Sequence, residues 1–222
     1  MFDYEAEYQR LRAAGRPGWA VVAHPDGALR LLDRLDQLHR TGIFPPPPAR
    51  VLELGCGNAR TALAMAGRGH SVWGIDVSPT AIAWAREIFA EAGQEGHFNV
   101  GPASAMPCFS AGQFDAVIDG QCLHCLIGPD RTACLAEVRR ILRPHGLFFV
   151  SSMVAPPKSA EAQARFDAER GCLLRDGEPY RSLKLLASLT DELAAAGFAT
   201  EDQTLGINAW WDHAMLACRR DD

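Results

Sequence analysis

The stretch from Val51 to Arg60, VLELGCGNAR, constrains the fold of this chain more than any other. It begins with mostly apolar residues and then breaks into Gly55-Cys56-Gly57. This pattern predicts a buried strand that enters a tight turn and then a helix, where the backbone can come close to a ligand. The turn is not a P-loop, because Arg60-Thr61 stands where a P-loop needs Lys followed by Ser or Thr. The dinucleotide fingerprint is also incomplete, because Arg60 replaces its third glycine.

Strand and helix signals alternate after this turn. The length of 222 residues is enough for one domain with a full-sized core. Strands that alternate with helices predict parallel βαβ units and an open, doubly wound α/β sheet. The predicted strands are 51–54, 69–76, 97–100, 114–119 and 147–150, and the predicted helices between them are 59–67, 79–92 and 129–142.

The segments that flank this alternating core have different patterns. Leucines at helical spacing predict a helix over 26–40, and the prolines of 44–50 form a stiff extended connector. Residues 154–184 are polar and irregular, with one helix expected near 158–170. The chain closes with a helix and two strands, and the short loop between these strands predicts that they pair antiparallel. These last elements are the helix 189–195 and the strands 198–205 and 213–219.

The charge of the chain argues against a nucleic-acid partner. The formal net charge is -5 and the pI is about 5.8, whereas phosphates favour a basic surface. The first ten residues carry acids and no apolar core, so they do not read as a signal peptide. Apolar windows are shorter than a spanning helix requires. We therefore expect a cytoplasmic protein with no membrane partner and seven mostly free cysteine thiols, and the oligomeric state stays open.

Two acids near the glycine turn indicate which ligand it serves. Asp76 ends the next predicted strand, where a carboxylate can accept both hydroxyl groups of a ribose. That device suits an adenosine in either a dinucleotide or S-adenosylmethionine (SAM). Glu53 precedes the first glycine by two residues and would repel a pyrophosphate at the helix N-terminus. SAM carries no phosphate, and its cationic methionine end would be attracted by this acid.

These motifs together resemble those of class I SAM-dependent methyltransferases of the small-molecule branch. VLELGCGNAR resembles their first motif, GIDVSPTAIAWAR (74–86) their second, and FDAVIDGQCLHCL (114–126) their fourth. The segment 130–152 resembles the helix, turn and fifth strand that follow. The resemblance covers about 45–219 and implies a Rossmann-like seven-stranded sheet whose last strand is antiparallel, with SAM across the carboxyl ends of the strands.

The resemblance also implies the cofactor-binding residues. One departure concerns the adenine, because Pro102 stands where relatives often have an Asp that binds the adenine amino group. A backbone carbonyl, Ser104 or water would then serve instead. The implied cofactor residues are Glu53, Gly55, Cys56, Gly57, Asn58, Asp76, Val77, Ala103, Ser104, Asp119 and Gly120.

The stretch Cys122-Leu123-His124-Cys125 raises a choice between a metal site and buried thiols. The sequence supplies no second pair of ligands to complete four-coordination, so we expect small buried thiols and no metal. His124 stands where related enzymes often have His or Asn near the transferred methyl group, so it is a candidate base. Asp119 is a second candidate at the same edge. Each could equally be a structural residue.

Aromatic residues outside the core motifs are candidates for binding the acceptor. Tyr4, Tyr8 and Trp19 lie in the segment 1–44, which we expect to form a helical lid. The remaining residues, 45–222, would form the SAM-binding domain, with 154–184 as an insertion on the substrate side. Aromatic side chains more often pack in cores, so this role competes with a purely structural one. The other candidates for substrate binding are Tyr180, Arg181 and Trp210.

The expected function is SAM-dependent methyl transfer to a nitrogen, oxygen or sulfur of a small molecule by in-line displacement. Two alternatives keep the same cofactor: a SAM-binding protein that transfers nothing, and an enzyme that cyclises SAM. An NAD-dependent oxidoreductase is disfavoured by Glu53 and Arg60.

Overall fold

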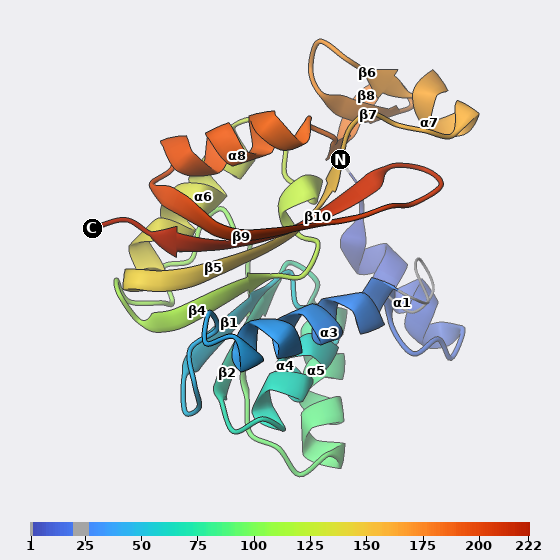
Figure 1. Cartoon of the computed structure of the whole chain (residues 1–222). Helices are drawn as coiled ribbons and strands as arrows, with labels where there is room; N and C mark the ends of the chain where they lie inside the picture. Colours follow the sequence, from blue (N-terminus) through green and yellow to red (C-terminus); the bar gives the residue numbers. More distant parts are fainter. Residues whose placement is uncertain (1, 20–26) are drawn as a thin grey trace.

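The computed structural model describes residues 2–19 and 27–222, and one seven-stranded sheet lies at its centre (Figure 1). Residue 26, where we expected the helix 26–40 to begin, lies outside the described residues. The strand order β3-β2-β1-β4-β5-β10-β9 has parallel neighbours up to β5, and β10 is antiparallel to both β5 and β9. This confirms the Rossmann-like sheet whose last strand is antiparallel. In sheet order the strands span His97–Val100, Ser71–Asp76, Arg50–Leu54, Phe114–Asp119, Leu142–Val154, Asp212–Arg220 and Phe198–Gly206.

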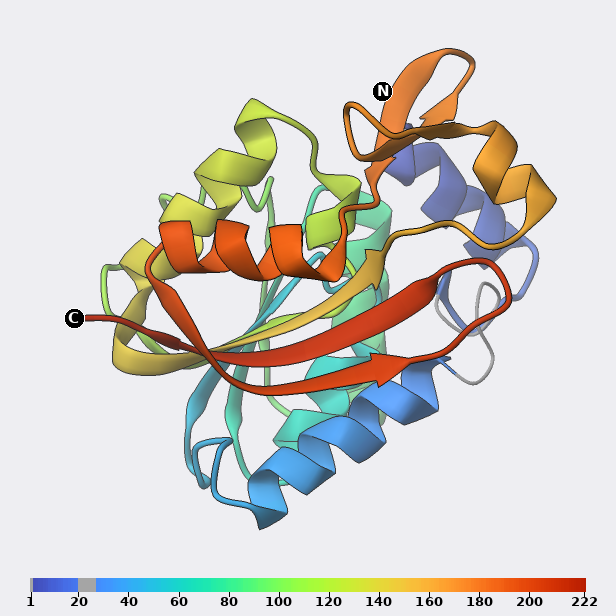
Figure 2. The same ribbon diagram turned by 45° about the horizontal axis from the view of Figure 1, so that its top comes forward.

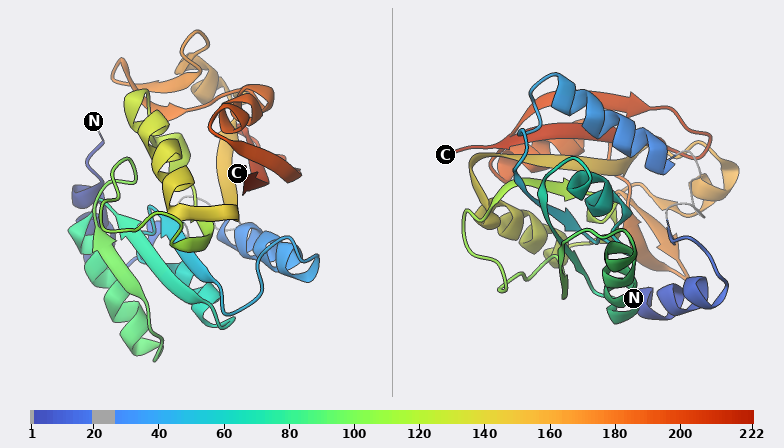
Figure 3. Two further views of the ribbon diagram at one scale, coloured as in Figure 1. Left: turned by 90° about the vertical axis from the view of Figure 1, so that its left-hand side faces the viewer. Right: turned by 90° about the horizontal axis from the view of Figure 1, so that it is seen from below.

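Helices cover both faces of this sheet (Figures 1 and 3). One face carries α3 (Gly27–Arg40), α4 (Arg60–Ala66) and α5 (Pro79–Glu91), and the other carries α6 (Pro129–Ile141) and α8 (Leu186–Ala195). The apolar stripe of each helix faces the sheet, so each face has its own buried cluster. Within the described parts of the chain, no helix is long and apolar enough to cross a membrane.

The carboxyl ends of the parallel strands meet at one edge of the sheet, where two other segments converge (Figure 2). The first is α1 (Tyr4–Ala13), which begins with Asp3 as its N-cap and buries Tyr8 and Leu11. The second is the segment between β5 and α8. Since ligands of doubly wound sheets bind at this edge, both segments lie where a ligand has to enter.

The segment 154–184 is more ordered than the sequence indicated. Our expected helix near 158–170 is wrong in extent, because α7 covers only Ala160–Ala164. A three-stranded antiparallel sheet follows it, and its strands are β6 (Phe166–Asp167), β7 (Cys172–Arg175) and β8 (Glu178–Ser182). Asp176-Gly177 joins β7 to β8 with positive φ values of 53° and 81°. Asp-Gly is a strong hairpin signal, and it would have identified these strands.

The local structure differs from the sequence patterns at β5 and after Cys122. The strand expected over 147–150 is longer, because β5 extends from Leu142 to Val154 and pairs with β10 over most of its length. The stretch after Cys122 forms a single 3-10 turn, η1 (Leu123–Cys125). This turn packs against β5 and β8, so it connects the sheet edge to the insertion.

Candidate active site

The glycine turn after β1 has a backbone that only glycine adopts easily. Gly55 and Gly57 both have φ of 54°, in the left-handed region. A Cβ atom on Gly55 would lie 2.8 Å from Cβ of Cys122, and one on Gly57 would overlap the hydroxyl oxygen of Tyr8. The two glycines therefore allow η1 and α1 to approach the turn closely.

The two acids that the sequence singled out lie buried beside this turn. Asp76 accepts hydrogen bonds from the amides of Gly57 and Ser78, each 2.9 Å long. Burial raises the pKa of Asp76, and these amides oppose that effect. Glu53 accepts a 2.9 Å hydrogen bond from the amide of Ala62, and burial raises its pKa to about 8. A Cβ atom on Gly120 would lie 3.1 Å from Oε1 of Glu53, so Gly120 leaves that carboxyl group approachable.

Asp119 holds the η1 turn in place. Its Oδ1 accepts hydrogen bonds from the amides of Cys122 (2.7 Å) and Leu123 (2.8 Å). Burial raises the pKa of Asp119 to about 6. From the opposite side Arg131 donates a 2.6 Å hydrogen bond to the carbonyl of Leu123 and pairs with Glu192 at 2.8 Å. Arg131 is a buried residue that the sequence does not reveal, because a single Arg within a helical pattern gives no sign that it is buried.

The η1 turn carries both His124 and the thiols. His124 is buried, with an exposed fraction of 6%. The Cys122 side chain packs on Gly55, and the Cys125 thiol contacts the Tyr4 hydroxyl group. All seven cysteines are free thiols. Within residues 2–19 and 27–222 no cluster of three or more His, Cys, Asp or Glu side chains could hold a metal ion.

The expected adenine side of the site lies at the ends of β2 and β3. Val77 is 47% exposed, whereas Ala103 is buried and Ser104 is half-buried. A 2.9 Å hydrogen bond from the amide of Gly101 to the carbonyl of Asp76 joins the two loops. These loops present an apolar, accessible surface next to the buried carboxyl group of Asp76.

Four aromatic rings from the N-terminal segment gather over the same edge, and we call them the aromatic roof: Phe2, Tyr4, Tyr8 and Trp19. Their ring centroids lie 4.9–5.9 Å apart in the contacting pairs. Tyr4, Tyr8 and Trp19 were predicted from the sequence, and Phe2 is an additional member. Asn58 supports the roof, because its side-chain amide donates a 2.9 Å hydrogen bond to the carbonyl of Pro17.

The insertion contributes Tyr180 and Arg181 from β8 to this region. Arg181 donates a 2.7 Å hydrogen bond to the Tyr4 hydroxyl group and lies 5.3 Å from the Tyr180 ring centroid. Trp210, from the loop between β9 and β10, is 47% exposed and lies beside Trp211. Its carbonyl accepts a 2.6 Å hydrogen bond from the amide of Lys158. The structure therefore brings Tyr4, Tyr180 and Arg181 together.

These residues fit the chemical groups of SAM. A ribose needs an acceptor such as Asp76, and an adenine needs an apolar surface such as Val77. A cationic methionine end suits the buried carboxyl group of Glu53, which Gly120 leaves approachable. A pyrophosphate would meet Glu53 next to the turn, which disfavours a dinucleotide.

Comparisons with known proteins agree with this fit. Residues 51–146 match the family model of a methyltransferase domain. The ubiquinone biosynthesis O-methyltransferase of Xanthomonas axonopodis pv. citri is 28% identical over 98% of this chain and 91% of its own length. The enzyme of the same name from Xanthomonas euvesicatoria pv. vesicatoria is 30% identical over 78% of this chain and 72% of its own length.

A solved structure extends the comparison to a bound cofactor product. The 1,6-didemethyltoxoflavin-N1-methyltransferase of Burkholderia thailandensis, with bound 1,6-didemethyltoxoflavin and S-adenosylhomocysteine, aligns with 100% of this chain and 92% of its own. Its TM-score is 0.65 at 21% identity, which shows a shared fold. The chain is therefore an enzyme that transfers a methyl group from SAM to a small molecule, and it belongs to the class I SAM-dependent methyltransferases of the small-molecule type.

Proposed function

We propose that this methyltransferase acts on a hydroxyl oxygen of a planar small molecule bound beneath the aromatic roof. The observation that carries the proposal is the position of the roof over the glycine turn, with the Tyr8 hydroxyl group against Gly57. Aromatic rings pack well, offset-stacked or edge-to-face, against another flat aromatic ring. The two related enzymes named as O-methyltransferases support oxygen as the acceptor atom.

Different residues at the sheet edge would bind different parts of SAM. Asp76 would bind the ribose hydroxyl groups, and Glu53 the cationic end of the methionine moiety. Val77, Ala103 and Ser104 would contact the adenine. SAM supplies a methyl group that its sulfonium already activates, so the protein has to align the acceptor and exclude water.

The acceptor oxygen forms a bond to the methyl carbon as the carbon–sulfur bond breaks, and the hydroxyl proton must leave. His124 is our candidate for receiving or orienting that proton, because η1 packs against β5 and β8 and carries Cys125 up to the roof. Asp119 would act as a positioning residue, because its carboxyl group holds the amides of Cys122 and Leu123.

The N-terminal part that contains α1 would act as a lid over the sheet edge, with 154–184 on the acceptor side. The rest of the expected lid segment 1–44 does not belong to this lid, because α3 and Phe44 pack in the buried cluster on one face of the sheet. In support, Glu5 of α1 binds the start of α5, and Tyr4 binds Arg181 of the insertion. We further infer a cytoplasmic enzyme that takes no nucleic acid or membrane partner, in line with the net charge of -5.

The acceptor atom can be identified directly. SAM whose methyl carbon is the heavy stable isotope is incubated with the protein and a cell metabolite extract, and labelled products are examined by NMR. The carbon chemical shift of a methyl group separates oxygen, nitrogen and sulfur acceptors. We expect a label on oxygen, whereas label found only on nitrogen or sulfur would overturn the proposal. A variant that lacks residues 1–22 should still melt cooperatively but lose transfer, and normal turnover by it would rule out the lid.

A further inference from the structure

The basic residues of the insertion 154–184 fall into two groups. Four of them form ion pairs with carboxylates: Lys158 with Asp212, Arg165 with Glu161, Arg170 with Asp167 and Lys184 with Glu192. Arg175 and Arg181 form none with any described residue. The nearby carboxylate of Glu7 interacts with Arg175 through its charge, without a direct ion pair. In a chain with a net charge of -5, two neighbouring guanidinium groups that form no direct ion pair need an explanation.

Both guanidinium groups rest on the same aromatic rings. The Arg175 guanidinium carbon lies 4.6 Å from the centroid of Tyr180 and 5.0 Å from that of Phe2. The corresponding distances for Arg181 are 5.3 Å and 5.9 Å. A ring face attracts a cation, and a planar guanidinium group keeps N–H donors at its edge for another ligand. The rings therefore fix both cations without neutralising them.

Arg181 also connects this pair to the reacting edge of the sheet. Its Nη1 donates to the Tyr4 hydroxyl oxygen at 2.7 Å and to the Tyr180 carbonyl at 3.0 Å. Among the described residues these are the hydrogen bonds that Arg181 donates, and both come from Nη1. The Tyr4 hydroxyl group in turn contacts the thiol of Cys125 in η1. Nε and Nη2 of Arg181 donate no hydrogen bond to a described residue, so they can bind a ligand at the roof.

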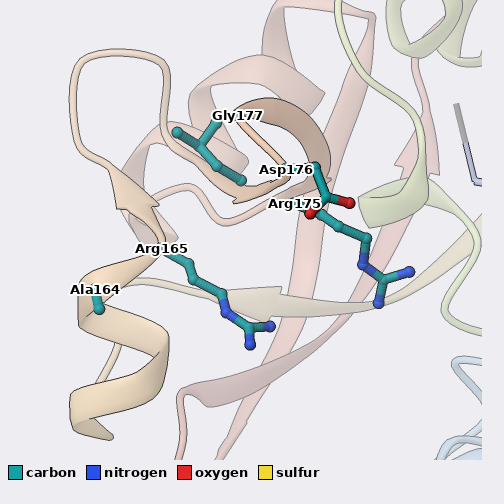
Figure 4. Close-up of a pocket in the computed structure, with 6 residues that line it drawn as sticks. Ala164, Arg165, Arg175, Asp176 and Gly177 are labelled. Carbon is teal, nitrogen blue, oxygen red and sulfur yellow. The ribbon is translucent and has the colours of Figure 1, made fainter.

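Arg175 lies over the Phe2 ring of the roof and also lines an outer hollow of about 620 Å³ in the insertion (Figure 4). Arg165 and Asp176 also line this hollow. Figure 4 shows Arg165 coming from the end of α7 and Arg175 from the hairpin β7–β8. Arg165 is already paired with Glu161 at 2.9 Å, which distinguishes it from Arg175.

We propose that the acceptor of this enzyme carries a carboxylate group and that Arg181, together with Arg175, binds it. This inference rests on the proposed function. A carboxylate fits the edge of a guanidinium group with two parallel hydrogen bonds, and it would supply the direct ion pair that neither arginine forms with a described residue. Anchored there, a flat acceptor would lie against Tyr4 and Tyr180 with its far end free to reach the η1 turn.

The test uses the full-length protein saturated with S-adenosylhomocysteine, and benzoate and its neutral isostere benzamide as probes. Ligand-observed NMR gives their dissociation constants for the wild type and for Arg181→Met, Arg175→Met and Arg165→Met. The Arg165→Met variant is the matched control, because Arg165 lines the hollow but has its own carboxylate. Since charge-assisted bonds to a carboxylate are strong, we expect benzoate to bind at least about tenfold more weakly to Arg181→Met, and more weakly to Arg175→Met. Benzoate should also bind more weakly at high salt.

Three results would overturn the inference. Equal binding of benzamide and benzoate would show that charge is not recognised. An equal loss in Arg165→Met would place the carboxylate in the outer hollow. A loss of S-adenosylhomocysteine affinity in Arg181→Met would assign the guanidinium group to the carboxylate of the cofactor. The proposed function can fail independently of this inference. Benzoate binding without methyl transfer to any oxygen would refute the proposed function alone. Methylation of the oxygen of a neutral acceptor, without benzoate binding, would refute only this inference.

Discussion

The hydroxyl group of Tyr8 lies directly over Gly57, so that a Cβ atom on Gly57 would overlap it. The next ring atom of Tyr8, Cζ, would lie 3.3 Å from that Cβ atom. A residue of α1 thus touches the turn that the sequence identified as the ligand site, although 49 positions separate the two residues (57 − 8 = 49). This contact is the point at which the lid meets the cofactor turn.

The Gly57→Ala variant tests whether this contact exists in solution. Alanine at a left-handed φ costs roughly 1–2 kcal/mol, and the overlap with Tyr8 should add to it. In a Tyr8→Phe background the hydroxyl oxygen is absent and the nearest ring atom, Cζ, would lie 3.3 Å from the added Cβ atom, so Gly57→Ala should cost at least about 1 kcal/mol less. Denaturant unfolding of the four proteins measures this coupling. Equal costs in both backgrounds would mean that Tyr8 does not lie over Gly57.

The sequence predicted the sheet well because its signals are local. The turn at Gly55-Cys56-Gly57, the strand-end acid Asp76 and the alternation of strands and helices each follow from a short stretch of residues. Their agreement leaves few topologies open. The insertion 154–184 was predicted, but its three-stranded sheet was not, because its strands are short and only Asp176-Gly177 indicates a hairpin.

The candidate site was only partly predictable, because it depends on contacts between distant segments. No local pattern indicates that Tyr4 meets Arg181 or that Glu5 meets Thr80. Likewise Arg131 reads as one more charged helix residue, yet it is buried against Glu192 and the η1 turn. Buried polar partners of this kind are decided by tertiary packing and not by periodicity.

The Asp76→Asn variant should bind SAM much more weakly. Charge-assisted bonds to two ribose hydroxyl groups are worth roughly 1.5–3 kcal/mol each, so we expect a loss of tenfold or more in affinity by calorimetry. The matched control is Asp115→Asn, because Asp115 accepts a 2.7 Å hydrogen bond from the amide of Arg50 at the opposite edge of the sheet. That variant should lose stability and keep its SAM affinity. Unchanged affinity in Asp76→Asn would remove Asp76 from the site.

A pair of histidines should make stability depend on pH. The Nε2 atoms of His39 and His70 lie 2.9 Å apart, His39 Nδ1 faces the carbonyl of Leu35 at 2.7 Å, and His70 Nδ1 accepts from the amide of Ala49 at 3.3 Å. This chain of bonds is satisfied when both rings are neutral. Burial, followed by the charges of His39 and Arg68, lowers the pKa of His70 from 6.5 to about 4.

Because the folded pKa of His70 is below the unfolded one, the unfolded chain binds more protons between these values. His70 alone should therefore lower the free energy of unfolding as the pH drops from about 6.5 to about 4, by roughly 2–3 kcal/mol at the most. Glu53 and Asp119 contribute with the opposite sign, because burial raises their pKa values. Urea unfolding at several pH values isolates the His70 contribution as the difference in slope between the wild type and His70→Asn. No such difference is expected for His145→Asn, which removes an exposed histidine. An equally steep slope in His70→Asn would assign the effect to other groups.

The last prediction concerns Glu5, which fastens α1 to the start of α5. Its carboxylate accepts hydrogen bonds from the hydroxyl groups of Ser78 (2.5 Å) and Thr80 (2.6 Å) and from the Thr80 amide (3.1 Å). These bonds, that of Ser78 first, lower the pKa of Glu5 to about 2. A depressed pKa means that the attachment is fully present above the ordinary value of 4.5 and is lost as the pH falls through about 2. A carboxylate at this position also suits the positive end of the helix dipole of α5.

Glu5→Ala should therefore release α1 while the core keeps its melting temperature within a few degrees. Trypsin should cut faster after Arg10 and Arg12, which lie in the released helix, and methyl transfer should fall because the lid no longer closes. Glu7→Ala is the matched control, because Glu7 lies in the same helix and pairs with Arg10 of that helix at 2.5 Å. That variant should keep its protease resistance. If Glu5→Ala and Glu7→Ala behave alike, the bonds to Ser78 and Thr80 do not hold the lid, and its closure must depend on Tyr8 and the aromatic roof instead.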